Sequence, residues 1–217
     1  GGAELLTVCY CPTCHGRREA GAGFGPPCLP RPDDLIAVDP GAVRPDRKGT
    51  RMAGRVGGKA LRPYADRSAI RRGALSDHVD PSLWLSDPVD LFFLQIQGSG
   101  VLVFEDGARV KALYAGDNGQ PFVGVARPMA RQGLLKPDNV SGGSIQRWLS
   151  DHAGPEAEAV MNLNPRYVYF RLAAADGREP AGAAGAPLPP GRAIAVDPAF
   201  HAYGEMIWLD AAAPTLV

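Results

Sequence analysis

Residues 87–100 read Asp87-Pro88-Val89-Asp90-Leu91-Phe92-Phe93-Leu94-Gln95-Ile96-Gln97-Gly98-Ser99-Gly100 and contain the signals for a helix and for the break after it. An aspartate side chain can accept a hydrogen bond from a free N–H group of the first turn, and proline is favoured at the first helical position. The two glycines around Ser99 then interrupt the apolar run. We therefore predict a helix over residues 89–94 and a new element after residue 100.

Downstream of this stretch, the sequence predicts a hairpin with strands over residues 101–104 and 109–114. Asp106-Gly107 lies between the two strands, and glycine provides the positive φ that a tight turn needs. The next predicted elements are helices over 122–132, 144–152 and 156–162 and a strand over 167–172. Residues 173–191 are rich in Ala, Gly and Pro, which predicts a connection between two packing units.

Upstream of residue 87, the predicted elements are short. Strands are expected over residues 35–39 and 51–56, each followed by a turn sequence. A helix is expected over 67–72, because Asp66 can cap its amino end and Gly73 can end it. Residues 1–32 show no helical or strand period and are predicted to be loop with one short strand.

The composition limits the class of protein. The chain has 217 residues with 23 Lys+Arg against 23 Asp+Glu, and this balance excludes a general electrostatic attraction to nucleic acid or to an anionic membrane. No apolar run approaches the roughly 20 residues that a membrane helix needs. The 27 glycines and 21 prolines predict many turns and short elements. We expect a mixed, β-rich fold of one or two domains, and no transmembrane segment.

Four cysteines gather near the amino end, at positions 9, 11, 14 and 28. Cys11-Pro12-Thr13-Cys14-His15 has the spacing of a c-type haem attachment site, with His15 as the axial ligand. Cys9, Cys11, Cys14 and Cys28 also fit a tetrahedral zinc site, two disulfides, or no function. The many short strands argue against haem, since a small haem protein of this type needs mainly helices around the macrocycle.

Several separated motifs together resemble the MltA family of membrane-bound lytic murein transglycosylases. The resemblance covers about residues 31–210, with the motifs in the family's order. The matching segments are 87–100, Tyr114-Ala115-Gly116-Asp117-Asn118-Gly119-Gln120-Pro121-Phe122, Asn162-Leu163-Asn164-Pro165-Arg166-Tyr167-Val168-Tyr169-Phe170, Arg31–Leu35, residues 48–55, and residues 187–198, which look like the entry to the family's 3D domain.

The resemblance implies a fold of two parts. These are an incomplete double-psi β-barrel, the 3D domain, and a second, inserted α+β domain. The implied boundaries are 1–83 for the amino-terminal part of the barrel, 84–175 for the inserted glycan-binding domain, 176–191 for a linker and 192–217 for the truncated start of the 3D domain. Residues 7–12 depart from the family's Thr-Gly-Tyr-Tyr-Glu-Pro pattern, so the cysteine cluster lies on a family motif.

The function that the resemblance implies is cleavage of the β-1,4 bond between N-acetylmuramic acid and N-acetylglucosamine, leaving a 1,6-anhydro sugar. One carboxylic acid can act first as acid and then as base in this reaction, and no cofactor is needed. The family's catalytic aspartate is expected past Val217, Asp197 is a weak substitute, and the chain alone is expected to be inactive. A non-catalytic peptidoglycan-binding module is the other reading of the same motifs.

The implied partner is the peptidoglycan glycan strand, without nucleic acid. We expect a monomer on the periplasmic side of a bacterial outer membrane, with both chain ends cut and a lipid anchor on an unseen segment before Gly1. Sugar binding calls for aromatic faces and for side-chain amides and hydroxyls at the ends of elements. The residues expected to bind substrate are Gln97, Ser99, Gly100, Tyr114, Asn118, Gly119, Asn164 and Tyr167. The other reading is that these glycines form turns and these aromatic rings form core.

Overall fold

The computed structural model describes residues 11–177, apart from 24, 48–51 and 137–139, together with scattered residues between 182 and 208. The chain divides into two compact units: residues 10–176 form one, and residues 1–9 with 177–217 form the other. Every described helix and strand belongs to the unit of residues 10–176. The account of the fold below therefore concerns this unit.

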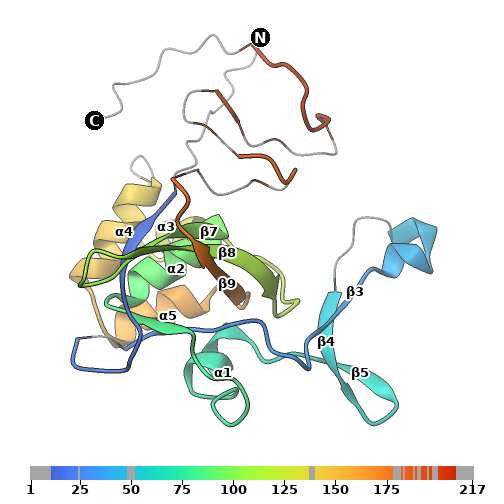
Figure 1. Ribbon diagram of the computed structural model, residues 1–217, viewed down its shortest axis with the longest axis horizontal. Coiled ribbons are helices and arrows are strands. Elements are labelled where there is room, and N and C mark those ends of the chain that lie inside the picture. The colour runs from blue at the N-terminus through green and yellow to red at the C-terminus, as the bar shows by residue number, and fades with distance from the viewer. Residues whose placement is uncertain are drawn as a thin grey trace. The chain divides into compact units, whose positions relative to one another are not determined.

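A six-stranded sheet forms the centre of the unit, with strand order β2-β6-β1-β7-β8-β9. Figure 1 shows β7, β8 and β9 of this sheet side by side. Its strands are β1 (Thr13–Arg17), β2 (Pro27–Cys28), β6 (Leu83–Leu85), β7 (Ser99–Val103), β8 (Arg109–Asp117) and β9 (Val168–Ala174). Only the β1–β7 pair is parallel. The N–H of Phe170 on β9 donates to the carbonyl of Leu29, just after β2, so the two edges of the sheet approach each other as in a barrel.

A second sheet has three antiparallel strands in the order β3-β4-β5. These are β3 (Ile36–Val38), β4 (Met52–Gly57) and β5 (Ala60–Pro63), and two short 3₁₀ helices, η1 (Pro40–Ala42) and η2 (Pro45–Arg47), follow β3. Strand β5 was not predicted. Its tight connection to β4 contains Gly58 at φ +65°, a conformation that glycine adopts without strain.

The helix α2 (Pro88–Gln97) confirms the prediction from residues 87–100 and is longer than expected. Asp87 accepts a hydrogen bond from the N–H of Val89 at 2.7 Å, and Pro88 is the first helical residue. Gly98 ends the helix with φ +80°, and its N–H donates to the carbonyl of Leu94 at 2.8 Å. The chain then enters β7 directly, because the αL glycine turns it back along the helix.

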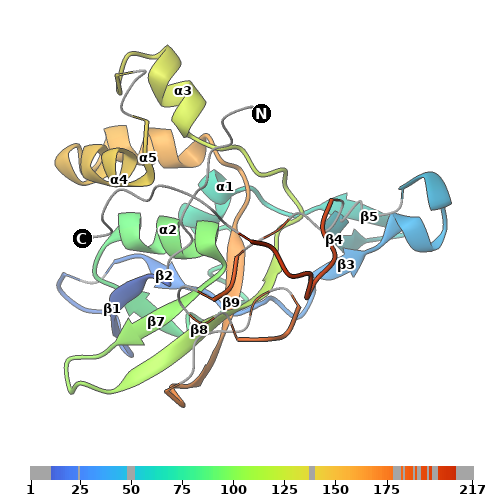
Figure 2. The same ribbon diagram turned by 90° about the horizontal axis from the view of Figure 1, so that it is seen from above.

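Helices α3 (Ala126–Arg131), α4 (Gly142–Asp151) and α5 (Pro155–Asn162) confirm the three helices predicted after the hairpin, while α1 (Arg67–Arg71) confirms the one before it. Helix α2 lies between the sheet and the group of α3, α4 and α5 (Figure 2). Its Phe92 and Phe93 pack with Met129 of α3, Leu149 of α4 and Met161 of α5. An apolar layer therefore joins α2 to the other helices.

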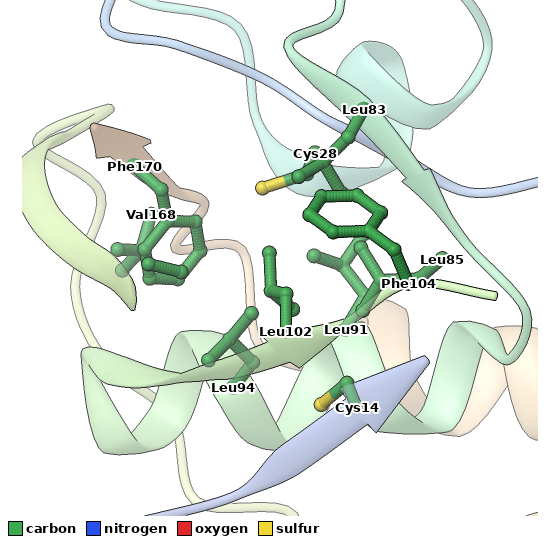
Figure 3. Close-up of a cluster of buried hydrophobic side chains, with 11 residues drawn as sticks. Cys14, Cys28, Leu83, Leu85, Leu91, Leu94, Leu102, Phe104, Val168 and Phe170 are labelled. Carbon is green, nitrogen blue, oxygen red and sulfur yellow. The ribbon is translucent and has the colours of Figure 1, made fainter. Parts of the chain in front are cut away.

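Two further clusters occupy the opposite faces of β9. Val168 and Phe170 pack with Leu94 and Leu102 in the cluster between α2 and the sheet, part of which Figure 3 shows. The alternate residues Tyr167 and Tyr169 belong to another cluster, with Leu29, Leu35 and Tyr64. Both faces of the first part of β9, residues 168–170, are thus buried, as the uninterrupted apolar character of residues 167–170 allows.

The mixed, β-rich fold class is confirmed. The main differences from prediction lie in residues 11–32, where both β1 and β2 form and join the central sheet, although only one short strand was expected. The local sequence gave no signal for these strands, because β1 is stabilised by pairing with β6 and β7 and β2 by pairing with β6, about 55 to 90 positions away. Half of residues 192–217, where the 3D domain was expected to begin, lie outside the described residues.

Candidate functional site

A cavity of about 530 Å³ lies beside α1 and α2 and next to the start of β9. This volume is in the range of small-molecule sites. Its lining combines two arginines with aromatic, apolar and hydroxyl side chains, and includes Arg67, Ile70, Arg71, Ser86, Phe92 and Tyr167. The cavity is therefore suited to a ligand that has both a negatively charged part and an apolar part.

Arg67 is the most unusual residue of this cavity, because this charged residue is only 2% exposed. Nη1 donates to Oε1 of Gln95 at 2.5 Å, Nε to the carbonyl of Asn164 at 2.9 Å, and Nη2 to the carbonyl of Arg166 at 2.6 Å. The ring centroids of Phe92 and Tyr167 lie 4.9 and 5.6 Å from its central carbon. Within the described part of the chain, Arg67 makes no ion pair.

The groups that accept hydrogen bonds from Arg67 are therefore polar but uncharged. Burial lowers the pKa of Arg67 to about 10, because the charged form loses water without gaining a carboxylate. Arg71, one turn further along α1, does have a partner: its Nε lies 3.3 Å from Oε1 of Glu158 on α5. The cavity thus carries two positive charges, of which one is neutralised by a carboxylate of the protein.

Two of the expected sugar-binding amides are buried in this region. Asn118 is 0% exposed: its Nδ2 donates to the carbonyls of Ala65 and Pro165, and its Oδ1 accepts from the N–H of Tyr167 at 2.9 Å. Asn164 is 2% exposed, and its Oδ1 accepts from the N–H groups of Val123 and Arg166. In this structure, both amides join loops to one another.

The two expected glycine contacts, Gly100 and Gly119, are sites of close packing. A Cβ on Gly100 would lie 2.5 Å from Leu94 Cδ1 and 2.7 Å from the carbonyl oxygen of Pro12. A Cβ on Gly119 would lie 2.4 Å from the backbone nitrogen of Ala53, and Gly119 also has φ +72°. Each glycine lets neighbouring parts of the chain approach closely. This is the structural role that the alternative interpretation of these glycines gives them.

Three expected contacts reach the surface, at one end of the central sheet. Gln97 ends α2, and Ser99 begins β7; both are half-buried. Tyr114 of β8 is 46% exposed, and its hydroxyl donates to Asp117 Oδ2 at 2.7 Å. Ser99 pairs with Leu113, the residue before Tyr114, so Ser99 and Tyr114 lie at the same end of the neighbouring strands β7 and β8. Phe122, also exposed, follows in the same motif.

Tyr167, the last expected contact, is 2% exposed and lies along the cavity. Its hydroxyl donates to the carbonyl of Pro27 at 3.2 Å. Burial raises the pKa of this phenol well above its usual range, so it stays protonated and acts as a donor. Sequence reasoning named Tyr167 as a ring for sugar contact, which stays a prediction, and gave no role to Arg67, which it saw only as the start of a helix.

The cysteines do not fit a haem or a zinc ion as they stand. Cys14 and Cys28 are 1% and 0% exposed thiols within the core cluster of Figure 3, while His15 points to the opposite, exposed side of β1. A porphyrin attached through Cys14 would have to displace this core. Among the described residues no three His, Cys, Asp or Glu side chains are grouped as metal ligands. Cys9 lies outside the described residues.

A family model described as the MltA specific insert domain matches residues 5–171. The chain belongs to the MltA family. Two solved structures share the fold of this MltA-family chain and cover 88% of it: MltA from Neisseria gonorrhoeae at 30% identity with a TM-score of 0.72, and a membrane-bound lytic murein transglycosylase from Agrobacterium tumefaciens at 34% with a TM-score of 0.77. The chain covers 54% and 52% of those two chains.

Curated relatives agree with this assignment. Membrane-bound lytic murein transglycosylase A of Escherichia coli K12 is 30% identical over 106 residues, which are 48% of this MltA-family chain and 29% of the relative. The Vibrio cholerae protein of the same name is 28% identical over 142 residues, or 65% of the chain and 38% of the relative. The chain thus spans well under half the length of the curated relatives it matches.

Other residues singled out in this MltA-family chain lie away from the cavity or cannot be placed. A second cavity of about 410 Å³ is lined by Asp33, Asp34, Arg55 and His78. Asp197, the weak substitute for the catalytic acid, lies outside the described residues. None of the helices in the described part has both the length and the apolar character that a membrane crossing requires.

Proposed function

We propose that this chain provides a glycan-binding part of a peptidoglycan lytic transglycosylase. The observation that carries the proposal is membership of the MltA family over residues 5–171, among relatives named lytic murein transglycosylases. The reaction is cleavage of the bond between N-acetylmuramic acid and N-acetylglucosamine, with formation of the 1,6-anhydro sugar. It adds no water and requires no metal or organic cofactor.

In this proposal Gln97, Ser99 and Tyr114 contact the glycan directly. Tyr114 is 46% exposed at the end of the sheet, where a sugar ring can stack on it. Gln97 and Ser99 offer an amide and a hydroxyl that make no side-chain hydrogen bond to other described residues. The buried amides Asn118 and Asn164 position the loops beneath this surface.

Binding is tested with a neutral N-acetylglucosamine hexamer and the full chain in titration calorimetry. We expect Tyr114→Ala and Gln97→Ala each to weaken affinity by roughly fivefold or more. Gln146→Ala is the matched control for Gln97→Ala, because it also removes a half-buried glutamine from a helix. Unchanged affinity in both surface variants would remove Gln97 and Tyr114 from the binding surface.

No catalytic acid is assigned within residues 1–217, since the family's aspartate is expected beyond Val217. We therefore expect the purified chain to bind murein sacculi without releasing 1,6-anhydromuropeptides. Release of these products would place a catalytic acid inside the chain, and Asp197→Asn would then be the first variant to examine. The proposed setting is a monomer at the periplasmic face of the outer membrane; light scattering at about the mass of one chain, 22.9 kDa, tests the monomer.

A further inference from the structure

The buried guanidinium of Arg67 is a positive charge without a countercharge. A fully buried, unpaired ion normally costs several kcal/mol, and protein interiors usually provide a carboxylate beside it. Here three neutral acceptors and two aromatic rings surround the group instead. Three of its five N–H bonds are used by these acceptors. A side chain that only joined α1 to neighbouring elements by hydrogen bonds would not need a charge.

Arg67 lines the cavity, so a ligand bound there can supply the missing countercharge. Arg67, Arg71 and Ser86 all line this space of about 530 Å³. Arg71 shares its charge with Glu158, whose side chain is 43% exposed, so that carboxylate is held loosely and is open to replacement. The rest of the lining includes Ile70, Leu91 and Phe92, which suit a small apolar group.

We propose that this cavity binds a carboxylate, and that the ligand is an acidic group of a muropeptide. That the ligand comes from murein rests on the proposed function. That the ligand is negatively charged rests on the two arginines. A guanidinium pairs with a carboxylate through two parallel N–H···O bonds, which a neutral amide or sugar hydroxyl cannot match. The cavity therefore recognises the peptide-bearing part of murein, at a place separate from the surface of Gln97 and Tyr114.

Murein offers two sources of carboxylate, the lactyl group of N-acetylmuramic acid and the acidic residues of the stem peptide. Titration of the full chain with N-acetylmuramic acid tests the lactyl group. Titration with N-acetylmuramyl-L-alanyl-D-isoglutamine tests the peptide carboxylate, because its lactyl group is an amide. The methyl ester of the second probe is the neutral control. Binding of either acid, without binding of the ester, supports the proposal and identifies the source.

Variants at the edge of the cavity test the role of charge without disturbing Arg67. Arg71→Gln should weaken binding of the acid probe by roughly tenfold. Glu158→Gln should strengthen it by about threefold, because Arg71 loses its protein carboxylate. Arg72→Gln is the matched control: Arg72 is adjacent on the same helix end, contacts Ser68 and does not line the cavity. A purely structural pair of arginines would not show tighter binding in Glu158→Gln.

A carboxylate introduced next to Arg67 should compete with the ligand, because it pairs with the same guanidinium. In Gln95→Glu the new carboxylate faces Nη1 of Arg67, so we expect at least tenfold weaker binding of the acid probe, with circular dichroism used to check that the variant is folded. If Gln95→Glu does not fold, Arg71→Gln and Glu158→Gln decide the question.

The proposal is overturned by equal binding of the acid and its ester, or by equal effects of Arg71→Gln and Arg72→Gln. It is also overturned by no binding of either acid at concentrations of tens of millimolar. None of these results depends on the neutral hexamer, so failure of the glycan surface and failure of the carboxylate site are seen in separate titrations. Loss of acid binding in 0.5 M salt agrees with the charge mechanism, since screening weakens it.

Discussion

Arg67 Nη1 and Gln95 Oε1 are 2.5 Å apart, and this contact ties the first residue of α1 to the buried face of α2. The same glutamine donates from Nε2 to the carbonyl of Val168 on β9 at 3.1 Å. One side chain therefore connects three elements that are distant in sequence. Because all three groups are buried, water cannot replace a lost partner, and the contact matters for stability as well as for the cavity.

We expect Gln95→Leu to lower the free energy of unfolding by about 2–4 kcal/mol, since it leaves a buried charge and a buried carbonyl each without one partner. Urea denaturation followed by circular dichroism measures the change. Gln97→Leu is the control, because Gln97 is half-buried two positions along and should cost less than about 0.5 kcal/mol. Equal losses in the two variants would contradict the role given to Gln95.

Gly119→Ala should be much more harmful than Gly133→Ala, although both glycines have φ +72°. The shared positive φ costs an alanine about 1 kcal/mol at either position. At Gly119 the new Cβ would also lie 2.4 Å from the backbone of Ala53, while nothing lies within 4 Å of it at Gly133. We expect a further loss of about 2 kcal/mol at Gly119, from backbone displacement. Thermal unfolding of both variants measures the difference, and equal midpoints would show that β4 can move away freely.

The elements that sequence reasoning predicted well are those whose ends depend on neighbouring residues. Asp66 and Asp87 cap α1 and α2 with their side chains, and Gly98 ends α2 in the αL conformation. Each of these contacts spans four residues or fewer. By contrast, β1 forms only because β7 and β6 lie beside it, and nothing within residues 11–20 indicates those partners. Helix caps can therefore be predicted from neighbouring residues, whereas the partner strands that stabilise a strand such as β1 cannot.

The candidate site divides in the same way. Asn118 and Asn164 have the residue type that binds sugars, and they lie in family motifs, yet their amides satisfy backbone groups from residues 65, 123 and 165–167. An asparagine amide has the same hydrogen-bonding groups whether it binds a ligand or a loop backbone. Only the fold therefore shows which of the two it binds. Arg67 was missed for the opposite reason, since a lone arginine near a helix start usually faces water.

Asn118→Asp tests whether this amide is structural. The substitution keeps the shape of the side chain but replaces both Nδ2 donors by an oxygen that faces the carbonyls of Ala65 and Pro165. We expect a loss of about 3 kcal/mol in the free energy of unfolding. Tyr114→Phe, which removes only an exposed hydroxyl, should cost less than about 1 kcal/mol. If Asn118→Asp were as stable as Tyr114→Phe, the amide would be free to serve a ligand.

The buried thiols predict how stability changes in alkaline solution. Burial, with a smaller effect of the nearby Asp90 charge, raises the pKa of Cys14 from 9.0 to about 12, and burial raises the pKa of Cys28 by the same amount. The folded chain therefore keeps both protons at a pH where the unfolded chain has lost them. The contribution of these thiols is fully present below pH 9 and is lost as the pH rises from 9 towards 12.

Each pH unit above 9 should remove about 1.4 kcal/mol per thiol from the free energy of unfolding, measured in urea with a reductant present. Tyr64, Tyr167 and Tyr169 add to the loss, because burial also raises the pKa of their phenols. The cysteine share is isolated by Cys14→Ala with Cys28→Ala, which leaves the tyrosines in place and should show a shallower fall between pH 9 and 10.5. If the free energy of unfolding falls with pH at the same slope in the double variant and the parent chain, the two thiols titrate in the folded state as they do in water. The core around β1 must then open to solvent far more readily than its packing indicates.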